Sequence, residues 1–246
     1  MKVLITAPMY CSDQMKNVME YAHQSFDEVI LNPFARTMTQ EEIAAMWDGA
    51  DAVIAGVESW DAEFIAKAPA GLKILARNGI GYDNVDVPAA NARGITVTVT
   101  RQAISDAVAD CTFALMLALA RHIIPMNAAV HSGSWGYAVA DDVHAKTIGI
   151  LGFGAIGQRI AKRAAGFEME ILAHDPYLSR EQIAELGAAK CEPEEIYRAA
   201  DYIVCTGPLT KERFHIINAE TVSMMKRPAE MINTASGPRG EAAGLE

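Results

Sequence analysis

The sequence predicts an α/β fold with two domains, each built on a parallel sheet. Short apolar runs alternate with amphipathic, capped stretches, a pattern typical of parallel strands covered by helices on both faces. The pattern is interrupted after residue 99 by one long helical stretch and then resumes. The length of 246 residues corresponds to about one and a half average domains, which suits two modest ones. We therefore expect two flavodoxin- or Rossmann-like domains, at residues 1–99 and 100–246.

The first domain is expected to contain five short strands. Apolar runs place them at residues 3–6, 29–31, 52–55, 73–76 and 95–99. Ser12 is placed to cap a helix that runs to about His23. Thr39 opens another helix, with acidic residues in its first turn facing the positive end of the helix dipole. A further helix is expected at residues 61–68.

The second domain begins with a long helix from Ser105 to at least Arg121. Its apolar face is wider than one stripe, which predicts burial at a domain junction or in a subunit interface. Residues 131–145 are polar and predict an extended connection, in which we expect Trp135 to be covered. Strands and helices then alternate, with strands at 147–151, 170–173, 203–205 and 229–233 and helices at 155–166, 179–186 and 219–225.

Composition excludes several classes of function. The formal net charge of −10 disfavours nucleic acid and anionic membranes as partners, because both require a cationic face. The most apolar helical run, residues 113–120, is far shorter than a membrane span. The four cysteines form no CxxC pair, so we expect neither disulfides nor a metal site. We expect a cytoplasmic protein.

A glycine fingerprint is the strongest local signal. Gly152, Gly154 and Gly157 have GxGxxG spacing between a strand and a helix, and Asp175 ends the next strand. In this context the first glycine permits a tight turn, the second admits a pyrophosphate and the third permits close helix–strand packing. Asp175 can accept hydrogen bonds from a ribose diol and would repel a 2′-phosphate, which favours NAD over NADP. The alternative is a strand–turn–helix whose glycines serve packing alone.

Several segments then match one family in order and spacing. They are LKILARNGIGYDNVDVPAANARGITVTVT, ISDAVADCTFALMLALAR, HSGSW, GILGFGAIGQRIA, HDPY and CTGPLTKERFHIIN. The chain resembles the D-isomer-specific 2-hydroxyacid dehydrogenases over nearly its whole length. The resemblance implies a NAD-binding Rossmann domain second, and a first domain that binds substrate and is completed by a returning C-terminal segment. It also implies hydride transfer between NAD(H) and a small 2-hydroxy or 2-keto acid, by a homodimer.

The resemblance also implies site residues. The backbone of Ile80 and Gly81 would hold the substrate carboxylate, since adjacent amides in a glycine-rich turn form an anion nest. A turn that serves only packing is the alternative. Val108 would touch the nicotinamide, and Ala155 and Ile156 would lie over the pyrophosphate. The far end of the cofactor would be lined by Gly207, Pro208 and Thr234.

The chain departs from the family at its catalytic residues. The family uses an Arg in an N-x-A-R-G segment, a Glu and a His, but residues 233–237 read NTASG, so Ser236 occupies the Arg position. A neutral hydroxyl cannot replace a guanidinium fork. The Glu and His positions would lie beyond Glu246. We expect a C-terminally truncated family member that is itself inactive; the alternative is a non-catalytic NAD(H)-sensing or partner-binding protein.

Overall fold

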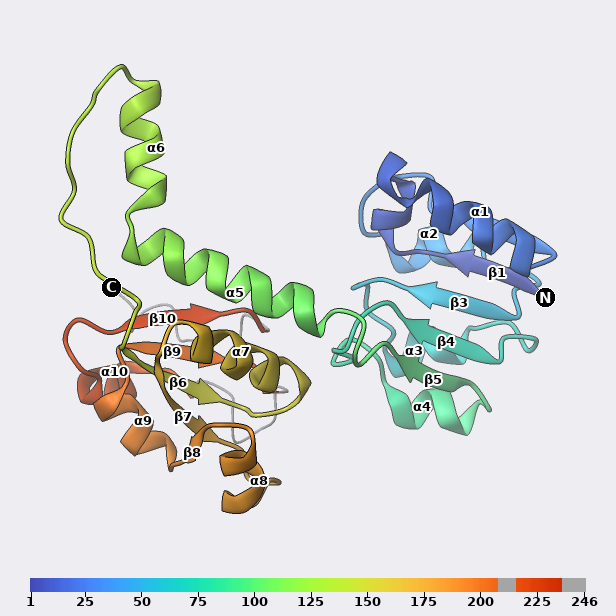
Figure 1. Cartoon of the computed structure of the whole chain (residues 1–246). Helices are drawn as coiled ribbons and strands as arrows, with labels where there is room; N and C mark the ends of the chain where they lie inside the picture. Colours follow the sequence, from blue (N-terminus) through green and yellow to red (C-terminus); the bar gives the residue numbers. More distant parts are fainter. Residues whose placement is uncertain (208–215, 236–246) are drawn as a thin grey trace. The chain divides into compact units, whose positions relative to one another are not determined.

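Two parallel sheets organise the chain, one in each of its two units (Figure 1). The structure is a computed structural model and describes residues 1–207 and 216–235. The first unit comprises Met1–Ile104 and the second Ser105–Glu246. The boundary thus follows residue 104 rather than residue 99, because the segment after the last strand of the first unit clusters with that unit. The predicted two-sheet α/β architecture is confirmed.

The first unit has the strand order β2-β1-β3-β4-β5, with every pair parallel. This is the flavodoxin-like doubly wound order. The strands are β1 (Lys2–Ile5), β2 (Glu28–Leu31), β3 (Ala52–Ala55), β4 (Ile74–Arg77) and β5 (Thr96–Val99). The helices are η1 (Pro8–Cys11), η2 (Asp13–Met15), α1 (Lys16–Ser25), α2 (Gln40–Ala44), α3 (Ala62–Ala66) and α4 (Val87–Ala92).

Helix starts in the first unit follow local side-chain chemistry, with one correction. The Thr39 hydroxyl accepts from the Glu42 amide in a capping box at α2, as its sequence predicts. Ser12 makes no side-chain cap; η2 follows it, and α1 begins only at Lys16. Helix α4, which the apolar pattern did not predict, is started by the Asp86 carboxylate and an early proline.

The core of the first unit lies on one face of its sheet. It is centred on stacked aromatic rings, with Trp47 and Phe64 centroids 4.7 Å apart and Trp60 5.1 Å from Phe64. Helices α2, α3 and α4 contribute to this core, whereas α1 does not. On the opposite face, the side chains of Ile74 and Thr96 are exposed. One face of the first sheet is therefore only partly covered by the described residues.

The second unit has the strand order β10-β9-β6-β7-β8, also parallel throughout. Taken from β8, this is the order 3-2-1-4-5 of a Rossmann sheet, which includes the switch point between its two halves. The strands are β6 (Thr147–Leu151), β7 (Glu170–His174), β8 (Ala189–Lys190), β9 (Tyr202–Cys205) and β10 (Glu230–Asn233). The helices are α5 (Ser105–Ala120), α6 (Ile123–His131), α7 (Ala155–Gly166), α8 (Arg180–Glu185), α9 (Pro193–Ala199) and α10 (Ala219–Met224).

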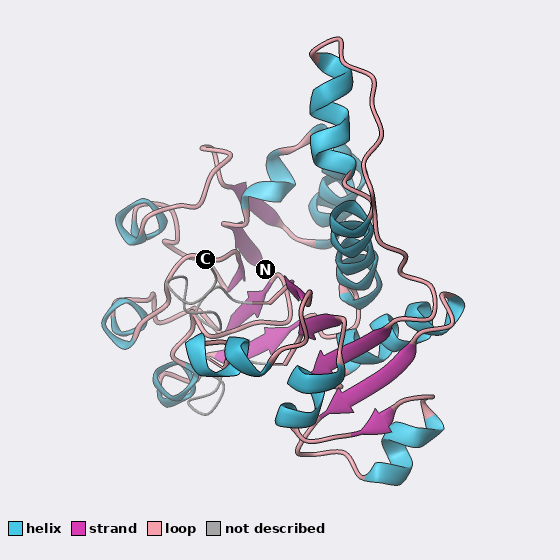
Figure 2. Ribbon diagram, turned by 90° about the vertical axis from the view of Figure 1, so that its left-hand side faces the viewer, coloured by secondary structure: helices cyan, strands magenta, loops and turns pink. Residues whose placement is uncertain are grey.

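Both faces of the second sheet are covered by helices (Figure 2). Alternate residues of β6 separate the two cores: Ile148 and Ile150 pack with α5 and α7, and Leu151 packs with α9. At Gly149 the helix α9 comes so close that an added Cβ would lie 2.2 Å from Cγ2 of Ile196. The absence of a side chain at position 149 thus sets the distance between helix and sheet.

The long predicted helix is broken in two. Helix α5 ends at Ala120, His122 adopts a left-handed φ of 52°, and α6 continues at an angle of 65°. Arg163 of α7 fastens α5 through Asp110, at 2.6 Å, and Asp106, at 3.2 Å. Among the described residues nothing covers Trp135, which is 87% exposed. No single described helix is long and apolar enough to cross a membrane; α5 and α6 meet that criterion only as a bent pair.

Replacing Gly149 should destabilise the second unit. In Gly149→Ala the new methyl would lie 2.2 Å from Ile196 and 3.1 Å from Ala200, an overpacking that costs about 1–3 kcal/mol. Gly166→Ala is the matched control, because nothing lies within 4 Å of its added Cβ. Chemical denaturation should show a lower free energy of unfolding for the first variant and an equal or higher one for the second. Equal stability of both variants would contradict the close packing of α9 on β6.

Candidate functional site

The carboxyl edge of the second sheet is a natural place for a ligand. The strand order reverses between β6 and β9, and in open α/β sheets ligands bind outside the carboxyl ends of strands at such a switch point. Four sequence-predicted residues follow strands at this edge: Gly152 after β6, Asp175 after β7, Gly207 after β9 and Thr234 after β10. The fold brings them to one edge although they are distant in sequence.

The glycine turn has a distinct steric requirement at each position. Gly152 has a φ of +106°, and a Cβ there would lie 2.4 Å from the Gly207 nitrogen. A Cβ at Gly157 would lie 2.4 Å from the carbonyl oxygen of Gly152. At Gly154, by contrast, an added Cβ meets nothing within 4 Å. The first and third glycines are therefore needed by the protein itself, and the second faces open space.

Helix α7 begins at Ala155 with no side-chain cap on its first amides. Helices α2, α3, α4, α8 and α10 each carry one. Uncapped amides at the positive end of a helix dipole form a binding site for an anion such as a pyrophosphate. Ala155 and Ile156 are the first two residues of this helix, where the sequence predicts the contact.

Asp175 is 92% buried by the chain, with only 8% of its surface exposed. Its Oδ2 accepts from the Phe153 amide at 2.9 Å, and its Oδ1 from the Tyr177 amide at 3.0 Å. The carboxylate thus ties the glycine turn to the end of β7, a role that the sequence did not indicate. Each oxygen keeps a lone pair, so the carboxylate can still accept from a diol.

The remaining predicted cofactor residues form a second group at this edge. The Gly207 amide donates to the Leu151 carbonyl at 3.2 Å, and the Thr206 hydroxyl donates to the Gly152 carbonyl at 2.7 Å. The hydroxyls of Thr234 and Thr112 lie 3.2 Å apart, and Thr112 donates to the carbonyl of Val108. Val108 and Thr234 are thus linked through one buried threonine. Pro208 and Ser236 lie outside the described residues.

In the first unit, the loop after β4 presents two free amides. The amides of Asn78 and Gly79 donate to Ala55 and Arg77, and the Gly79 carbonyl accepts from Thr100. Among the described residues neither Ile80 nor Gly81 donates its amide to any acceptor. The backbone of this loop is therefore anchored up to residue 79, and the next two amides are available to an anion, as the resemblance implies.

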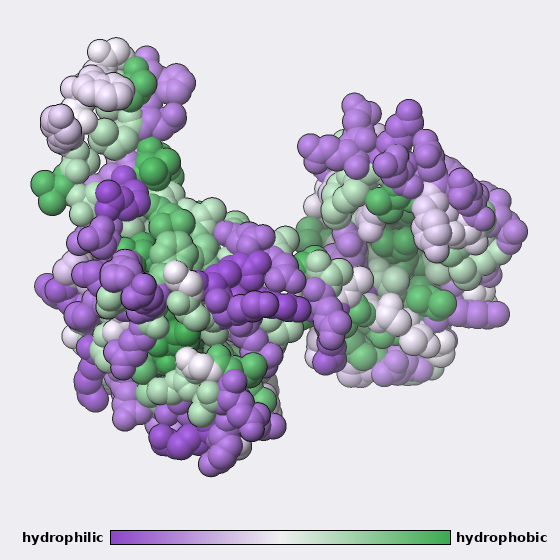
Figure 3. All heavy atoms as spheres, viewed as in Figure 1, coloured by the Kyte–Doolittle hydropathy of each residue, from purple (hydrophilic) through white to green (hydrophobic). Residues whose placement is uncertain are grey.

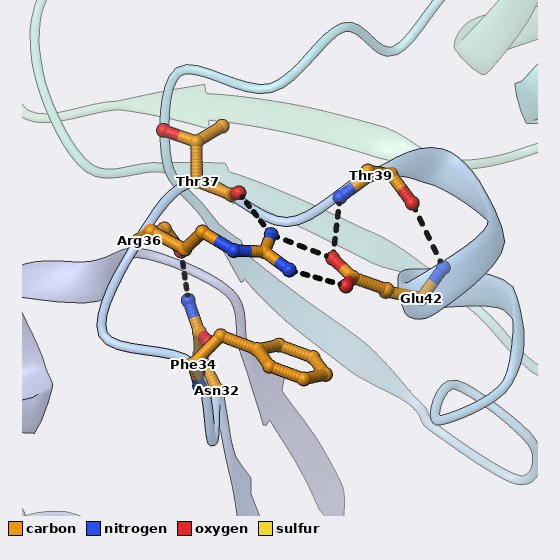
Figure 4. Close-up of polar contacts among 6 residues, drawn as sticks. All are labelled: Asn32, Phe34, Arg36, Thr37, Thr39 and Glu42. Carbon is orange, nitrogen blue, oxygen red and sulfur yellow. Dashed lines mark hydrogen bonds and ion pairs between the residues drawn. The ribbon is translucent and has the colours of Figure 1, made fainter.

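The loop after β2, the edge strand of the same sheet, is held by its own side chains (Figure 4). The side-chain amide of Asn32 donates, through Nδ2, to the backbone carbonyls of Thr6 and Arg36, at 2.7 and 2.8 Å. The Arg36 guanidinium binds Glu42 at 2.6 Å and lies 4.7 Å from the Phe34 ring centroid. Glu42 raises the pKa of Arg36. These groups are committed to loop structure and leave little for a ligand.

Two charged residues at the same edge were not identified from the sequence. Glu58 is 4% exposed; its Oε1 accepts from the Gly56 amide, the Trp60 indole and the Thr6 hydroxyl, and its Oε2 has no partner among the described residues. Arg77, the last residue of β4, is half-buried. A cation that directly ends an apolar run is the signal that could have revealed Arg77; nothing in the sequence around Glu58 indicates burial.

Comparison with known proteins agrees with this geometry. Residues 113–245 match the family model described as D-isomer specific 2-hydroxyacid dehydrogenase, NAD binding domain. A glyoxylate reductase of Pyrococcus horikoshii is 44% identical over 73% of this chain and 56% of its own length. A D-3-phosphoglycerate dehydrogenase of Methanocaldococcus jannaschii is 33% identical over 96% of this chain and 44% of its own length. The chain thus spans about half the length of these relatives.

A solved structure supports the fold over the whole chain. The D-lactate dehydrogenase of Aquifex aeolicus, complexed with NAD and lactic acid, aligns with a TM-score of 0.84 at 25% identity. The alignment covers 100% of this chain and 72% of that protein.

The second and third glycines of the turn, Gly154 and Gly157, should respond differently to substitution. Gly154→Val should weaken dinucleotide binding at least about tenfold while leaving the melting temperature unchanged, since the added atoms occupy open space beside α7. Gly157→Val should instead lower the melting temperature, because its Cβ meets the Gly152 carbonyl. Titration of NADH fluorescence and thermal denaturation separate the two effects. Unchanged NADH binding by Gly154→Val would argue against a pyrophosphate at this turn.

Proposed function

The chain belongs to the D-isomer-specific 2-hydroxyacid dehydrogenase family, and we propose that it binds NAD(H) in its second unit and a small 2-hydroxy or 2-keto acid in its first. The observation that carries the proposal is the uncapped start of α7 behind an open Gly154, with Asp175 at the adjacent strand end. These residues fit a dinucleotide, because a pyrophosphate needs free amides and close backbone approach rather than a basic patch.

When bound, the nicotinamide ring supplies the hydride that is exchanged with C2 of the acid. The protein's own part is to bind and orient. The α7 amides would hold the pyrophosphate, and the remaining lone pairs of Asp175 would hold the adenosine ribose diol. The charge of Asp175 opposes a 2′-phosphate, which supports NAD(H) as the preferred cofactor. Val108 would touch the nicotinamide. Because Thr112 links Thr234 to Val108, we propose that Thr234 lies near the nicotinamide as well, and not at the far end of the cofactor.

The acid would be held in the first unit by the amides of Ile80 and Gly81. Both lack acceptors among the described residues, and the anchored Asn78 and Gly79 keep them in place. The relatives are named for glyoxylate and 3-phosphoglycerate, and both compounds are small carboxylates. This supports a 2-hydroxy or 2-keto acid as the ligand class for the first unit.

Proton transfer is the step for which these 246 residues offer no evident group. Ser236 stands where the family has its Arg, and none of the six histidines lies in the TPHxxG-like context of the family's proton donor. We propose that the 246-residue chain on its own binds NAD(H) without appreciable turnover. Binding of NAD(H) without turnover would also agree with the alternative, a protein that senses NAD(H) or binds a partner.

We also propose that α5, α6 and the following extended segment form a twofold interface. Large apolar side chains are exposed there, as Figure 3 shows along α5 and α6. They are Leu115, Leu119, Ile123, Ile124, Val130, Trp135, Tyr137 and Val139. A gathering of exposed large apolar side chains on neighbouring elements usually marks an association site.

NADH should bind at least about tenfold more tightly than NADPH, a difference of about 1.4 kcal/mol. The variant Asp175→Asn should narrow the gap, since it removes the charge but keeps one acceptor for the backbone amides. Asp175→Ala is a poorer variant, because it would leave both amides without a partner. Fluorescence titration with both nucleotides is the measurement. Equal affinities of the unchanged protein would refute the preference for NAD.

Light scattering at micromolar concentration should show a dimer. Ile124→Glu, at a side chain 70% exposed in α6, should shift it to monomer by placing a charge in the interface. Val18→Glu is the matched control on α1, where the side chain is 45% exposed, and should leave the dimer intact. A monomer in the unchanged chain would count against the proposed interface.

Turnover of the 246-residue chain should stay below about 1 s⁻¹ with glyoxylate, hydroxypyruvate, pyruvate or phosphohydroxypyruvate. A missing charged donor costs about 10²- to 10³-fold, and missing acid–base catalysis about 10²- to 10⁴-fold. The assay follows NADH absorbance, with NADH binding measured on the same sample to show that the cofactor site is intact. Turnover above that limit would show that another residue supplies the proton.

A further inference from the structure

The Arg77 side chain packs against the loop that carries the two free amides of the first unit. Its Nη1 donates to the carbonyl of Asn78 and lies 2.8 Å from the place that a Cβ of Gly79 would take. Gly79 has a φ of +146°, a conformation that side chains rarely adopt. The guanidinium therefore occupies space that only a glycine leaves, one residue before Ile80.

Within residues 1–207 and 216–235, no carboxylate contacts the Arg77 guanidinium to neutralise its charge. Its Nε is buried and has no hydrogen-bond partner among the described residues. Burial lowers the pKa of Arg77, and Glu58 acts in the opposite direction only at longer range. The Glu58 carboxylate is held elsewhere, by the Gly56 amide at 3.0 Å and the Trp60 indole at 3.3 Å. A half-buried cation without a close partner is costly and favours the approach of an anion.

Other arginines of the chain show the contrast. Arg36 is bound by Glu42 at 2.6 Å, and Arg163 by Asp110 at 2.6 Å. Arg77 combines a missing ion-pair partner with two unused amides only three and four residues away in sequence. A net charge of −10 would repel an anionic substrate unless a local cation opposed it.

We propose that Arg77 supplies the positive charge that holds the substrate carboxylate on the amides of Ile80 and Gly81. The inference rests on the proposed function, since it assumes that a 2-hydroxy or 2-keto acid binds at this loop. The cation then comes from β4 of the first unit. The Arg that the family uses for this purpose is absent, because Ser236 occupies its position in the sequence. Arg77 would therefore make the first unit bind a carboxylate more tightly than a neutral ligand of the same shape.

The test compares oxamate, a carboxylate that cannot be reduced, with oxamide, its neutral counterpart. Calorimetry is performed on the full chain with NADH present. Arg77→Gln should weaken oxamate binding about tenfold, abolish the preference for oxamate and flatten its dependence on salt. Arg77→Lys should retain most of the preference because it keeps the charge. Lys73→Gln is the control: it removes one positive charge from an exposed residue just before the amino end of β4 and should change little.

Each outcome decides between distinct conclusions. Unchanged oxamate binding by Arg77→Gln, or equal loss of oxamate and oxamide, would overturn the role of Arg77 and leave the proposed function standing. If the unchanged chain binds NADH but neither ligand, the acid site of the proposed function fails, and this inference fails with it. If Arg77→Gln does not fold, Arg77→Lys still decides, because loss of its carboxylate preference would contradict a role based on charge.

Discussion

At the carboxyl edge of the second sheet, the backbone of the glycine turn lies so close to neighbouring backbone that no side chain would fit between them. The position of the proposed cofactor site depends on this contact. Gly152 lies against Gly207, and Gly157 against the Gly152 carbonyl. The contact joins β6 to β9 at the switch point and brings the start of α7 to the sheet edge. Asp175 then fixes the turn by accepting the Phe153 amide. The open space at Gly154 is the consequence of these constraints.

Each unit would have to bind an anion although the chain as a whole is negatively charged, and the two units offer different donors for this purpose. Both ligands proposed here are anions, and the chain carries a net charge of −10. In the second unit a helix terminus offers amides, so no side-chain cation is needed. In the first unit the loop after β4 offers two amides, and the half-buried Arg77 at the end of β4 is the cation that we propose to act with them. Local donors thus offset the unfavourable overall charge in each unit.

Polar side chains at the carboxyl edge of the first sheet divide into two kinds. Asn32 and Arg36 are satisfied by neighbours in their own loop and serve its shape. Glu58 and Arg77 each retain a buried atom without a partner among the described residues. Natural structures leave few such atoms unpaired, and those that remain call for an explanation such as water or a ligand. The unpaired atoms after β3 and at the end of β4 are therefore consistent with a ligand at this edge of the sheet.

The sequence by itself determined the described strands other than β8, the glycine turn and the place of Asp175, because apolar alternation and steric demands act between near neighbours in the chain. The two-residue strand β8 is too short to show such a pattern. Only the tertiary structure decided which donors are free. In the part of the chain that the structure describes, Ile80 and Gly81 lack acceptors, Asp175 binds two amides and Arg77 lacks an ion pair. None of this can be read from neighbours in the sequence. The break at His122 differs from these contacts, because Pro125 lies shortly after it in the sequence. A proline has no amide to donate and its ring clashes with the carbonyl four residues earlier, so the sequence did carry a local signal for the bend.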